Sequence, residues 1–252
     1  MAGHSHWANI AHKKGLIDAK RGKLWSKLAK GIMVAAKAGG GDPNQNLRLR
    51  YAIIDAKAGN MPKDTIDRAI KKGTGDLEGV NFEEILYEGY GPNGVAILCD
   101  ILTDNRNRTA GEVRKIFELA GGNLGATGCV AWMFDRKGLL SIPADQTDEE
   151  SLMELALEAG ADDVRHEGAN FDVTCSPDVY SNVCDAIDAA GLKTEVRQIT
   201  RIPKDTIDLD PAAVPGVLKL MNTLDDHDDV QNVSANFNIP DEALAALESG
   251  QN

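Results

Sequence analysis

Several features that would assign this chain to a membrane, secreted or disulfide-stabilised class are missing from its sequence. No apolar run approaches the roughly 18 residues that a membrane-spanning helix needs. The N-terminus lacks a basic start followed by an apolar stretch, so we expect no secretory signal and a cytoplasmic location. The four cysteines form no C-x-x-C pair, which argues against a zinc ribbon or a disulfide scaffold and favours free thiols.

Signatures of catalysis are also missing. The sequence has no nucleophile elbow, no Walker phosphate loop and no metal-hydrolase signature. The glycine-rich "GGNLGATG" matches no nucleotide-binding fingerprint, so we interpret it as a loop. The stretch "DDHDD" at 225–229 lacks calcium-loop spacing, and we interpret it as an exposed helix end. We therefore expect no enzymatic activity, no catalytic residues, no cofactor and no metal site.

The net charge of −12 conceals two parts of opposite sign. Residues 1–75 contain 15 of the 27 lysines and arginines but only 5 of the 39 acidic residues, whereas the remainder contains 12 basic and 34 acidic residues. A basic segment next to acidic domains produces a localised positive surface, which is typical of nucleic-acid-binding proteins. An ordinary solvated basic face is the alternative.

The basic segment is predicted to be helical. In "DAKRGKLWSKLAKGIMVAAKAGGG", apolar residues recur at helical spacing. Four lysines step by three, four and three and therefore share the adjoining face: Lys20, Lys23, Lys27 and Lys30. Like charges at this spacing repel one another, and no acidic residue is interleaved among them, so a polyanion would relieve the repulsion.

Two more helices are expected before residue 75. The second is predicted to begin with Asp42 as N-cap and Pro43 in its first turn. Its inward-facing residues are expected to be Leu47, Tyr51, Ile54 and Ala58. The third begins in "MPKD" and ends at Gly73.

The rest of the chain alternates strands and helices. "EILYEGY" and "GVAILCDIL" predict strands around a "GPNG" turn, and "CVAWMF" predicts a further strand. Between them, Thr109 and Glu112 predict a capping box at the start of a helix. From Gly138 to Ile202 the predicted order is βαββαβ, the ferredoxin-like arrangement. A strand, a helix and a last strand follow and would complete the domain begun before it.

These elements predict an α+β protein in which an N-terminal helical domain precedes two α/β domains, one inserted into the other. The basic helical domain is expected to span residues 1–78. The middle α/β domain would combine 79–136 with 203–240, the inserted ferredoxin-like domain would span 137–202, and 241–252 would form a C-terminal tail.

The stretch "GHSHWANIAHKKG" at residues 3–15 permits three interpretations. A zinc site on its three histidines, or a nuclease using His4 and His6, would need carboxylate or cysteine partners at suitable spacing, which the stretch lacks. A nucleic-acid-binding arm needs no such partners. Lys13 and Lys14 would pair with phosphates, while Trp7 and the histidines contact bases or ribose. For Trp7, a hydrophobic staple onto the helices is the alternative.

We therefore predict a nucleic-acid-binding surface that runs from this arm onto the helices. Its candidate residues are His4, His6, Trp7, Lys13, Lys14, Lys20, Arg21, Lys23, Lys27, Lys30, Arg48 and Arg50. Arg106 and Arg108 lie at a strand-to-helix junction and are candidates for secondary phosphate contacts. Pairing with local acids such as Asp104 is the alternative for these two arginines.

Long motifs in a fixed order give the chain a resemblance to the YebC family. They are "GHSHWANIAHKKG", "DAKRGKLWSKL", "GGGDPNQNLRLRYAI", "NMPKDTIDRAIKKGTG", "YEGYGPNGVAI", "LTDNRNRT" and "GGNLGATG". Trp25 departs from the phenylalanine usual in relatives but keeps an aromatic ring. The resemblance implies a helical domain followed by two α/β domains, and a DNA-binding transcriptional regulator in the cytoplasm without established catalytic activity. Other members, including mitochondrial relatives, are linked to translation.

Three functions follow as expectations. The first is a DNA-binding transcriptional regulator, as the resemblance implies. The second is a ribosome-associated factor that binds ribosomal RNA and eases synthesis of proline-rich stretches, which lysine-dominated backbone contact and the lack of a clear helix-turn-helix would suit. The third is an adaptor whose basic domain docks an acidic protein. No membrane partner is expected, and the sequence does not predict an oligomeric state.

Overall fold

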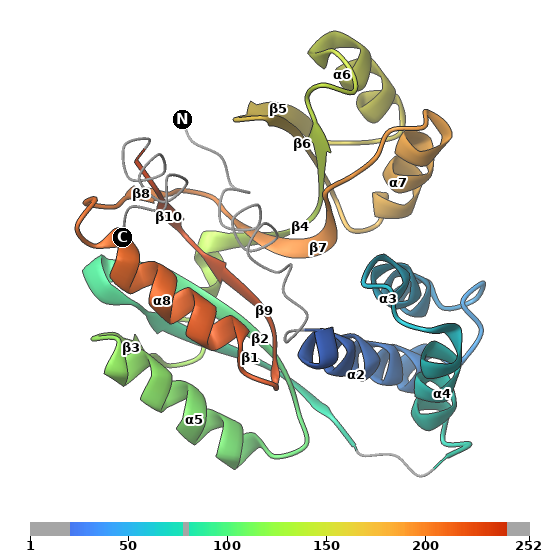
Figure 1. The fold of residues 1–252 in the computed structure, drawn as a ribbon. Helices are drawn as coiled ribbons and strands as arrows, with labels where there is room; N and C mark the ends of the chain where they lie inside the picture. The colour runs from blue at the N-terminus through green and yellow to red at the C-terminus, as the bar shows by residue number, and fades with distance from the viewer. Residues whose placement is uncertain (1–20, 78–80, 241–252) are drawn as a thin grey trace.

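The N-terminal part of the computed structural model, which describes residues 21–77 and 81–240, is a unit of three helices. They are α2 (Arg21–Gly39), α3 (Leu47–Ala58) and α4 (Lys63–Thr74). Ile32 from α2, Leu49 from α3 and Ile66 from α4 are buried together and form its core. The three predicted helices are therefore present, and they lie at one end of the molecule (Figure 1).

The start of α3 differs from the prediction. Asn46, not Asp42, is the N-cap, and its side-chain oxygen accepts the N–H of Leu49 at 3.1 Å. Asp42 instead organises the preceding turn, where its carboxylate accepts the N–H of Asn44 at 2.9 Å. The inward face shifts with the later start: Leu49 and Ala56 are buried, whereas Leu47 is 43% exposed.

A four-stranded antiparallel sheet, in the order β3-β1-β2-β9, follows the helical unit. Its strands are β1 (Glu83–Tyr90), β2 (Ala96–Thr103), β3 (Asn123–Leu124) and β9 (Val230–Ala235). The helices α5 (Arg106–Leu119) and α8 (Val214–Asp225) cover one face (Figure 1), where Phe117 and Leu220 are fully buried. A short 3₁₀ turn over Pro92–Gly94 joins β1 to β2, so the predicted hairpin is confirmed.

Two local predictions in this region are wrong. The helix α5 begins at Arg106 with Asn105 as its N-cap, so the proposed capping box of Thr109 and Glu112 does not form, and Thr109 is buried inside the helix. "CVAWMF" is not a strand over its length: it contains the 3₁₀ turn η3 (Ala131–Met133), and only its last residue, Phe134, begins a strand. The carboxylate of Glu88 accepts the N–H groups of Val130 and Ala131, which removes donors that a strand ladder would use.

The segment between η3 and Pro203 forms a second antiparallel sheet with two helices. Its elements are β4 (Phe134–Pro143), α6 (Glu149–Glu158), β5 (Asp163–Glu167), β6 (Asn170–Cys175), α7 (Tyr180–Ala189) and β7 (Val196–Pro203). The strand order β5-β6-β4-β7 is the ferredoxin-like arrangement, as predicted. The first sheet thus takes β9 from beyond this segment and its other strands from before it.

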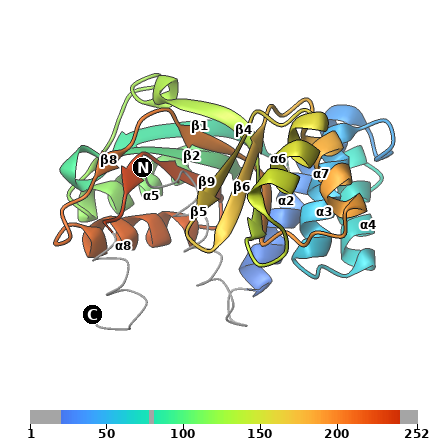
Figure 2. The same cartoon turned by 90° about the horizontal axis from the view of Figure 1, so that it is seen from above.

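Side-chain contacts link the helical unit, the first sheet and the second sheet. Arg201 of β7 pairs with Asp100 of β2 at 3.0 Å, which links the two sheets. Tyr51 of α3 packs edge-on against Tyr180 of α7, with ring centroids 5.1 Å apart. Seen from above in Figure 2, α3 therefore lies beside α7. A short parallel pair, β8 (Ile207–Asp208) and β10 (Phe237–Asn238), closes the far end. Among the helices of residues 21–77 and 81–240, none is long and apolar enough to cross a membrane.

Candidate nucleic-acid interface

Three of the predicted phosphate-binding lysines form a row on α2 and contact one turn. We call Lys23, Lys27 and Lys30 the lysine stripe, and residues 225–229, between α8 and β9, the acidic turn. Lys30 Nζ donates to Asp229 Oδ1 at 2.7 Å and to the carbonyl of Asp228 at 2.9 Å. Lys27 donates to the carbonyl of Asp225 and lies 3.4 Å from its carboxylate. Lys23 donates to the carbonyl of Asp226 at 3.2 Å.

Two acceptors of the lysine stripe, the carbonyls of Asp225 and Asp226, lie at the C-terminal end of α8. α8 ends at Asp225, and the carbonyls at a helix C-terminus lack partners within the helix and carry the negative end of its dipole. Lys23 and Lys27 satisfy these two carbonyls, and each also lies within 4 Å of a neighbouring carboxylate. In Figure 1 the N-terminal end of α2 accordingly lies beside the C-terminal end of α8.

The sheet β3-β1-β2-β9, which we call the middle sheet, and α5 hold the acidic turn from the side opposite the lysine stripe. Asp229 Oδ2 accepts from Arg108 at 2.7 Å and from the hydroxyls of Thr109 at 2.8 Å and Thr103 at 3.0 Å. His227 accepts the N–H of Asp229 on Nδ1, so its Nε2 donates to Glu112 at 2.9 Å. These hydrogen bonds fix the conformation of the acidic turn, so its acceptor atoms are held in place independently of the lysine stripe.

Asp229 is the buried centre of this network. Burial alone would raise the pKa of its carboxyl, but the hydrogen bonds from Lys30, Arg108 and Thr109 outweigh burial and hold that pKa well below its usual range. Lys30 Nζ also lies 5.5 Å from the centre of the Phe82 ring. The earlier interpretation of "DDHDD" as an exposed helix end is wrong for Asp229, because only 4% of this residue is exposed.

The other predicted residues have different surroundings. Arg48 pairs with Glu84 at 2.8 Å, and the guanidinium of Arg50 donates to the carbonyls of Pro43 and Asn44. Arg108 pairs with Asp104 at 2.9 Å and with Asp229, so it takes the acidic partners considered as the alternative. Arg106 is exposed beside it. His4, His6, Trp7, Lys13, Lys14 and Lys20 lie outside the described residues, and the Arg21 side chain does too.

Exposed cations that were not predicted as binding residues extend the basic surface. Lys63, Arg68, Lys71 and Lys72 of α4 and Lys57 of α3 are all exposed. The pattern "RAIKK" near the end of α4 could have indicated them, since three of its five residues are basic.

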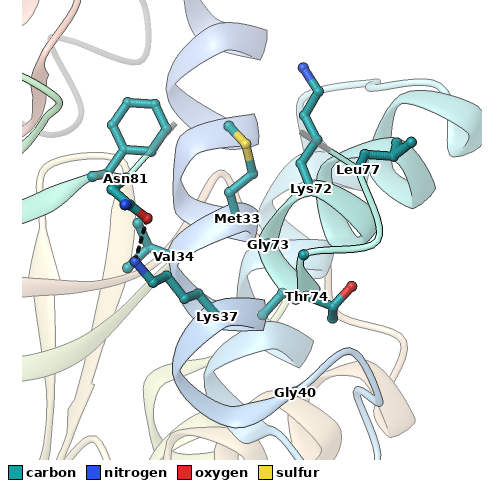
Figure 3. A pocket seen from close by; sticks show the side chains of 12 residues that line it. Met33, Val34, Lys37, Gly40, Lys72, Gly73, Thr74, Leu77 and Asn81 are labelled. Carbon is teal, nitrogen blue, oxygen red and sulfur yellow. Dashed lines mark hydrogen bonds between the residues drawn. The ribbon is translucent and has the colours of Figure 1, made fainter. Parts of the chain in front are cut away.

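A cavity of about 440 Å³ opens between α2, α4 and the start of β1 (Figure 3). Met33, Val34 and Phe82 supply apolar walls, and Lys37 and Lys72 are its basic lining residues. Lys37 is held by Asn81, whose side-chain oxygen accepts from Nζ at 2.7 Å. Within the part of the chain that the structure describes, no group of three or more His, Cys, Asp and Glu side chains could hold a metal ion.

Comparison with known proteins matches nearly the whole chain to one family. Residues 5–76 match the model "TACO1/YebC protein N-terminal domain", and residues 82–237 match "TACO1/YebC second and third domain". A protein of Desulfatibacillum aliphaticivorans is 57% identical over 97% of this chain and 99% of its own length. A protein of Rhodopirellula baltica is 57% identical over 97% of this chain and all of its own length. Both bear the name "Probable transcriptional regulatory protein".

One solved structure is similar over the same span. The crystal structure of a conserved hypothetical protein from Aquifex aeolicus superposes with a TM-score of 0.84 at 49% sequence identity. The match covers 94% of this chain and 98% of that one.

Proposed function

This chain belongs to the TACO1/YebC family, and from that premise we propose that it is a non-enzymatic regulator of gene expression that binds nucleic acid in the cytoplasm. The names of its relatives favour transcription regulation, and therefore DNA, as the first target to test. The binding surface would be the basic N-terminal part: the arm before α2, the lysine stripe, and Arg48 and Arg50.

The observation that supports this proposal most is the chemistry of the lysine stripe. Each of its three ammonium groups is matched to a carboxylate or carbonyl oxygen, and anionic oxygens are also what a nucleic-acid backbone offers. From Lys23 to Lys30 the helix advances roughly 10 Å. That length corresponds to about three phosphate steps along one strand of a duplex.

The three helices lack the side chains that read adenine. α2, α3 and α4 contain no asparagine or glutamine, the residues that pair with adenine in the major groove. The exposed cations on α4 would add further phosphate contacts. Since phosphates are common to DNA and RNA, this observation also supports a second candidate, a factor that binds ribosomal RNA.

The proposal is tested by titrating the full chain with labelled duplex DNA and with ribosomes at several salt concentrations. Lys23→Ala/Lys27→Ala/Lys30→Ala should weaken binding at least tenfold at low salt. It should also reduce the slope of log K against log salt by about two to three, because each phosphate contact contributes about 0.7 to 0.9.

The matched control is Lys115→Ala/Lys193→Ala/Lys219→Ala, which removes three exposed lysines from other surfaces and leaves the same net charge. It should bind like the wild type, and circular dichroism should show that both variants are folded. Binding to ribosomes that survives competitor DNA would favour the translation role. Absence of any salt-dependent binding would reject the proposal. The remaining candidate would then be an adaptor whose basic domain docks an acidic protein.

A further inference from the structure

We infer that the acidic turn is an internal competitor for nucleic acid, which must leave the lysine stripe before the stripe can bind phosphates. This inference rests on the proposed function and adds its regulation: the molecule described here is the closed form. The partner that opens it is a nucleic-acid backbone, which offers the stripe the same kind of acceptor atoms.

The first argument is that the turn and a nucleic-acid backbone exclude each other. Only 13% of the Lys27 side chain and 15% of the Lys30 side chain are exposed, and the acidic turn surrounds their ammonium groups. A phosphate oxygen needs the same donor atoms at about the same distance. One set of acceptors therefore has to be exchanged for the other.

The second argument is that the turn is built to act as an acceptor. His227 is fixed to Glu112, and Asp229 to Arg108 and two threonines, so the turn keeps its shape when the lysines leave. Because Arg108 remains on Asp229, the buried carboxylate would still have a cationic partner in the open form. Release of the lysine stripe therefore does not leave the buried carboxylate of Asp229 without a cationic partner.

The third argument is that the exchange leaves the helical unit packed, so that its cost is confined to the buried partners of Lys27 and Lys30. Lys23 and Asp228 are 3.9 Å apart with side chains 56% and 71% exposed, and exposed pairs of this kind contribute little. The apolar core of the helical unit, which includes Ile32 and Ala35, forms among α2, α3 and α4 and not against the turn. Exchange of the stripe's partners therefore does not require the three helices to unpack.

The test removes two of the four carboxylates of the acidic turn and leaves its buried centre unchanged. Asp225→Asn/Asp228→Asn removes the two exposed carboxylates that pair with the stripe and keeps Asp229. The matched control, Glu154→Gln/Glu158→Gln, removes two exposed carboxylates from α6 and so reduces general repulsion by the same charge. The turn variant should bind duplex DNA or ribosomes at least tenfold more tightly than the control. Equal affinities of the two variants would overturn the inference.

A second measurement follows the contact in the wild-type chain. A carbodiimide joins a lysine amine to a contacting carboxylate as an amide, and the water that is lost converts the reagent to its urea. Lys27 should be joined to Asp225, and mass spectrometry of the digested protein should identify the linked peptides. Saturating nucleic acid should abolish this link, whereas a link between Lys137 and Asp162, which pair at 2.7 Å on the inserted sheet, should persist.

The outcomes separate the inference from the function on which it rests. Binding that leaves the Lys27–Asp225 link intact would overturn the inference that the acidic turn competes with nucleic acid, but would keep the proposed nucleic-acid-binding function. Absence of binding by the wild type and by both variants would reject both. Binding by the wild type that becomes at least tenfold tighter in the turn variant would support both.

Discussion

Lys30 and Asp229 are 199 residues apart in the chain and form an ion pair with Nζ and Oδ1 at 2.7 Å. Their side chains are only 15% and 5% exposed, so this pair is the most buried link between the N-terminal helices and the middle sheet among the described ion pairs. Arg108 and two threonines share the same carboxylate. The pair thus connects the lysine stripe directly to the core of the middle sheet.

Replacing Asp229 with asparagine should destabilise the protein by about 3 kcal/mol, because it removes the negative charge between two cations at a buried site. Urea unfolding at neutral pH would measure the loss. Asp228→Asn is the control, since its carboxylate is 71% exposed and should contribute less than about 1 kcal/mol. Similar losses for the two variants would show that Asp229 has no special role.

The Lys30–Asp229 pair also makes the unfolding free energy of the protein depend on pH. Because its pKa is lowered in the folded protein, Asp229 stabilises the fold fully above its unfolded pKa of about 3.9 and loses that contribution as the pH falls below it. The difference in unfolding free energy between wild type and Asp229→Asn should therefore be constant from pH 5 to 8 and shrink below about pH 4.

Asp55 should have the opposite effect on the pH dependence of stability. Burial raises the pKa of this α3 carboxyl to about 7, and the positive charge of Arg197 opposes the rise only in part. The folded chain then binds more protons than the unfolded chain between about pH 4 and 7, so stability should fall as the pH rises through that range and level off above it. Asp55→Asn should remove this contribution to the slope and make the protein more stable than the wild type at pH 8.

Unfolding by urea at intervals between pH 5 and 8 would measure this effect. Asp67→Asn, at an exposed position on α4, is the control and should keep the slope of the wild type. An unchanged slope in Asp55→Asn would show that this carboxyl does not couple the packing of α3 to pH.

Glu88 should be required for the loop that precedes β4. Its carboxylate accepts the N–H groups of Gly128, Val130 and Ala131 at 2.5, 2.8 and 2.7 Å. Burial would raise the pKa of Glu88, but these three donors, together with the charge of Arg201, lower it. Glu88→Gln turns one acceptor into a donor that faces other donors, which should cost about 2 kcal/mol.

Hydrogen exchange would localise the effect of Glu88→Gln. The amides of Gly128, Val130 and Ala131 should exchange faster, while those of β6 should keep their protection. Glu84→Gln, which removes an exposed carboxylate on the same strand, should leave the loop unchanged. Unaltered exchange of the three amides in Glu88→Gln would contradict this role.

Hydrophobic periodicity predicts the order of the helices and of most long strands, because these elements are defined by local residues. The βαββαβ order of the inserted sheet follows from alternating strands such as "GLLSI" and from helices bounded by turn residues. Helix starts were harder to predict. Asp42 and Asn46 are both good caps by type, and the choice of Asn46 depends on its side chain also donating to the carbonyl of Ala35 in α2.

The surroundings of the lysine stripe could not be predicted by local reasoning. Spacing correctly placed Lys23, Lys27 and Lys30 together, but their partners lie 198 or more residues away. The sequence contained both halves of the contact, an unrelieved row of positive charge and the run "DDHDD", without any local signal that they meet. Only the packing of α2 beside α8 brings them together.

The packing of α2 on α4 depends on the absence of a side chain at Gly73, on the wall of the cavity in Figure 3. A Cβ there would lie 2.5 Å from the carbonyl oxygen of Met33 and 2.7 Å from the Cβ of Ala36. Gly73→Ala should therefore cost about 1 to 3 kcal/mol by forcing the helices apart. Gly31→Ala, in the middle of α2, adds a methyl that meets no atom within 4 Å apart from its chain neighbours and the adjacent turns of its own helix backbone, and should instead stabilise the chain by about 0.5 to 1 kcal/mol. Thermal unfolding should shift in opposite directions for the two variants, and a Gly73→Ala protein as stable as Gly31→Ala would show that this helix crossing is not close.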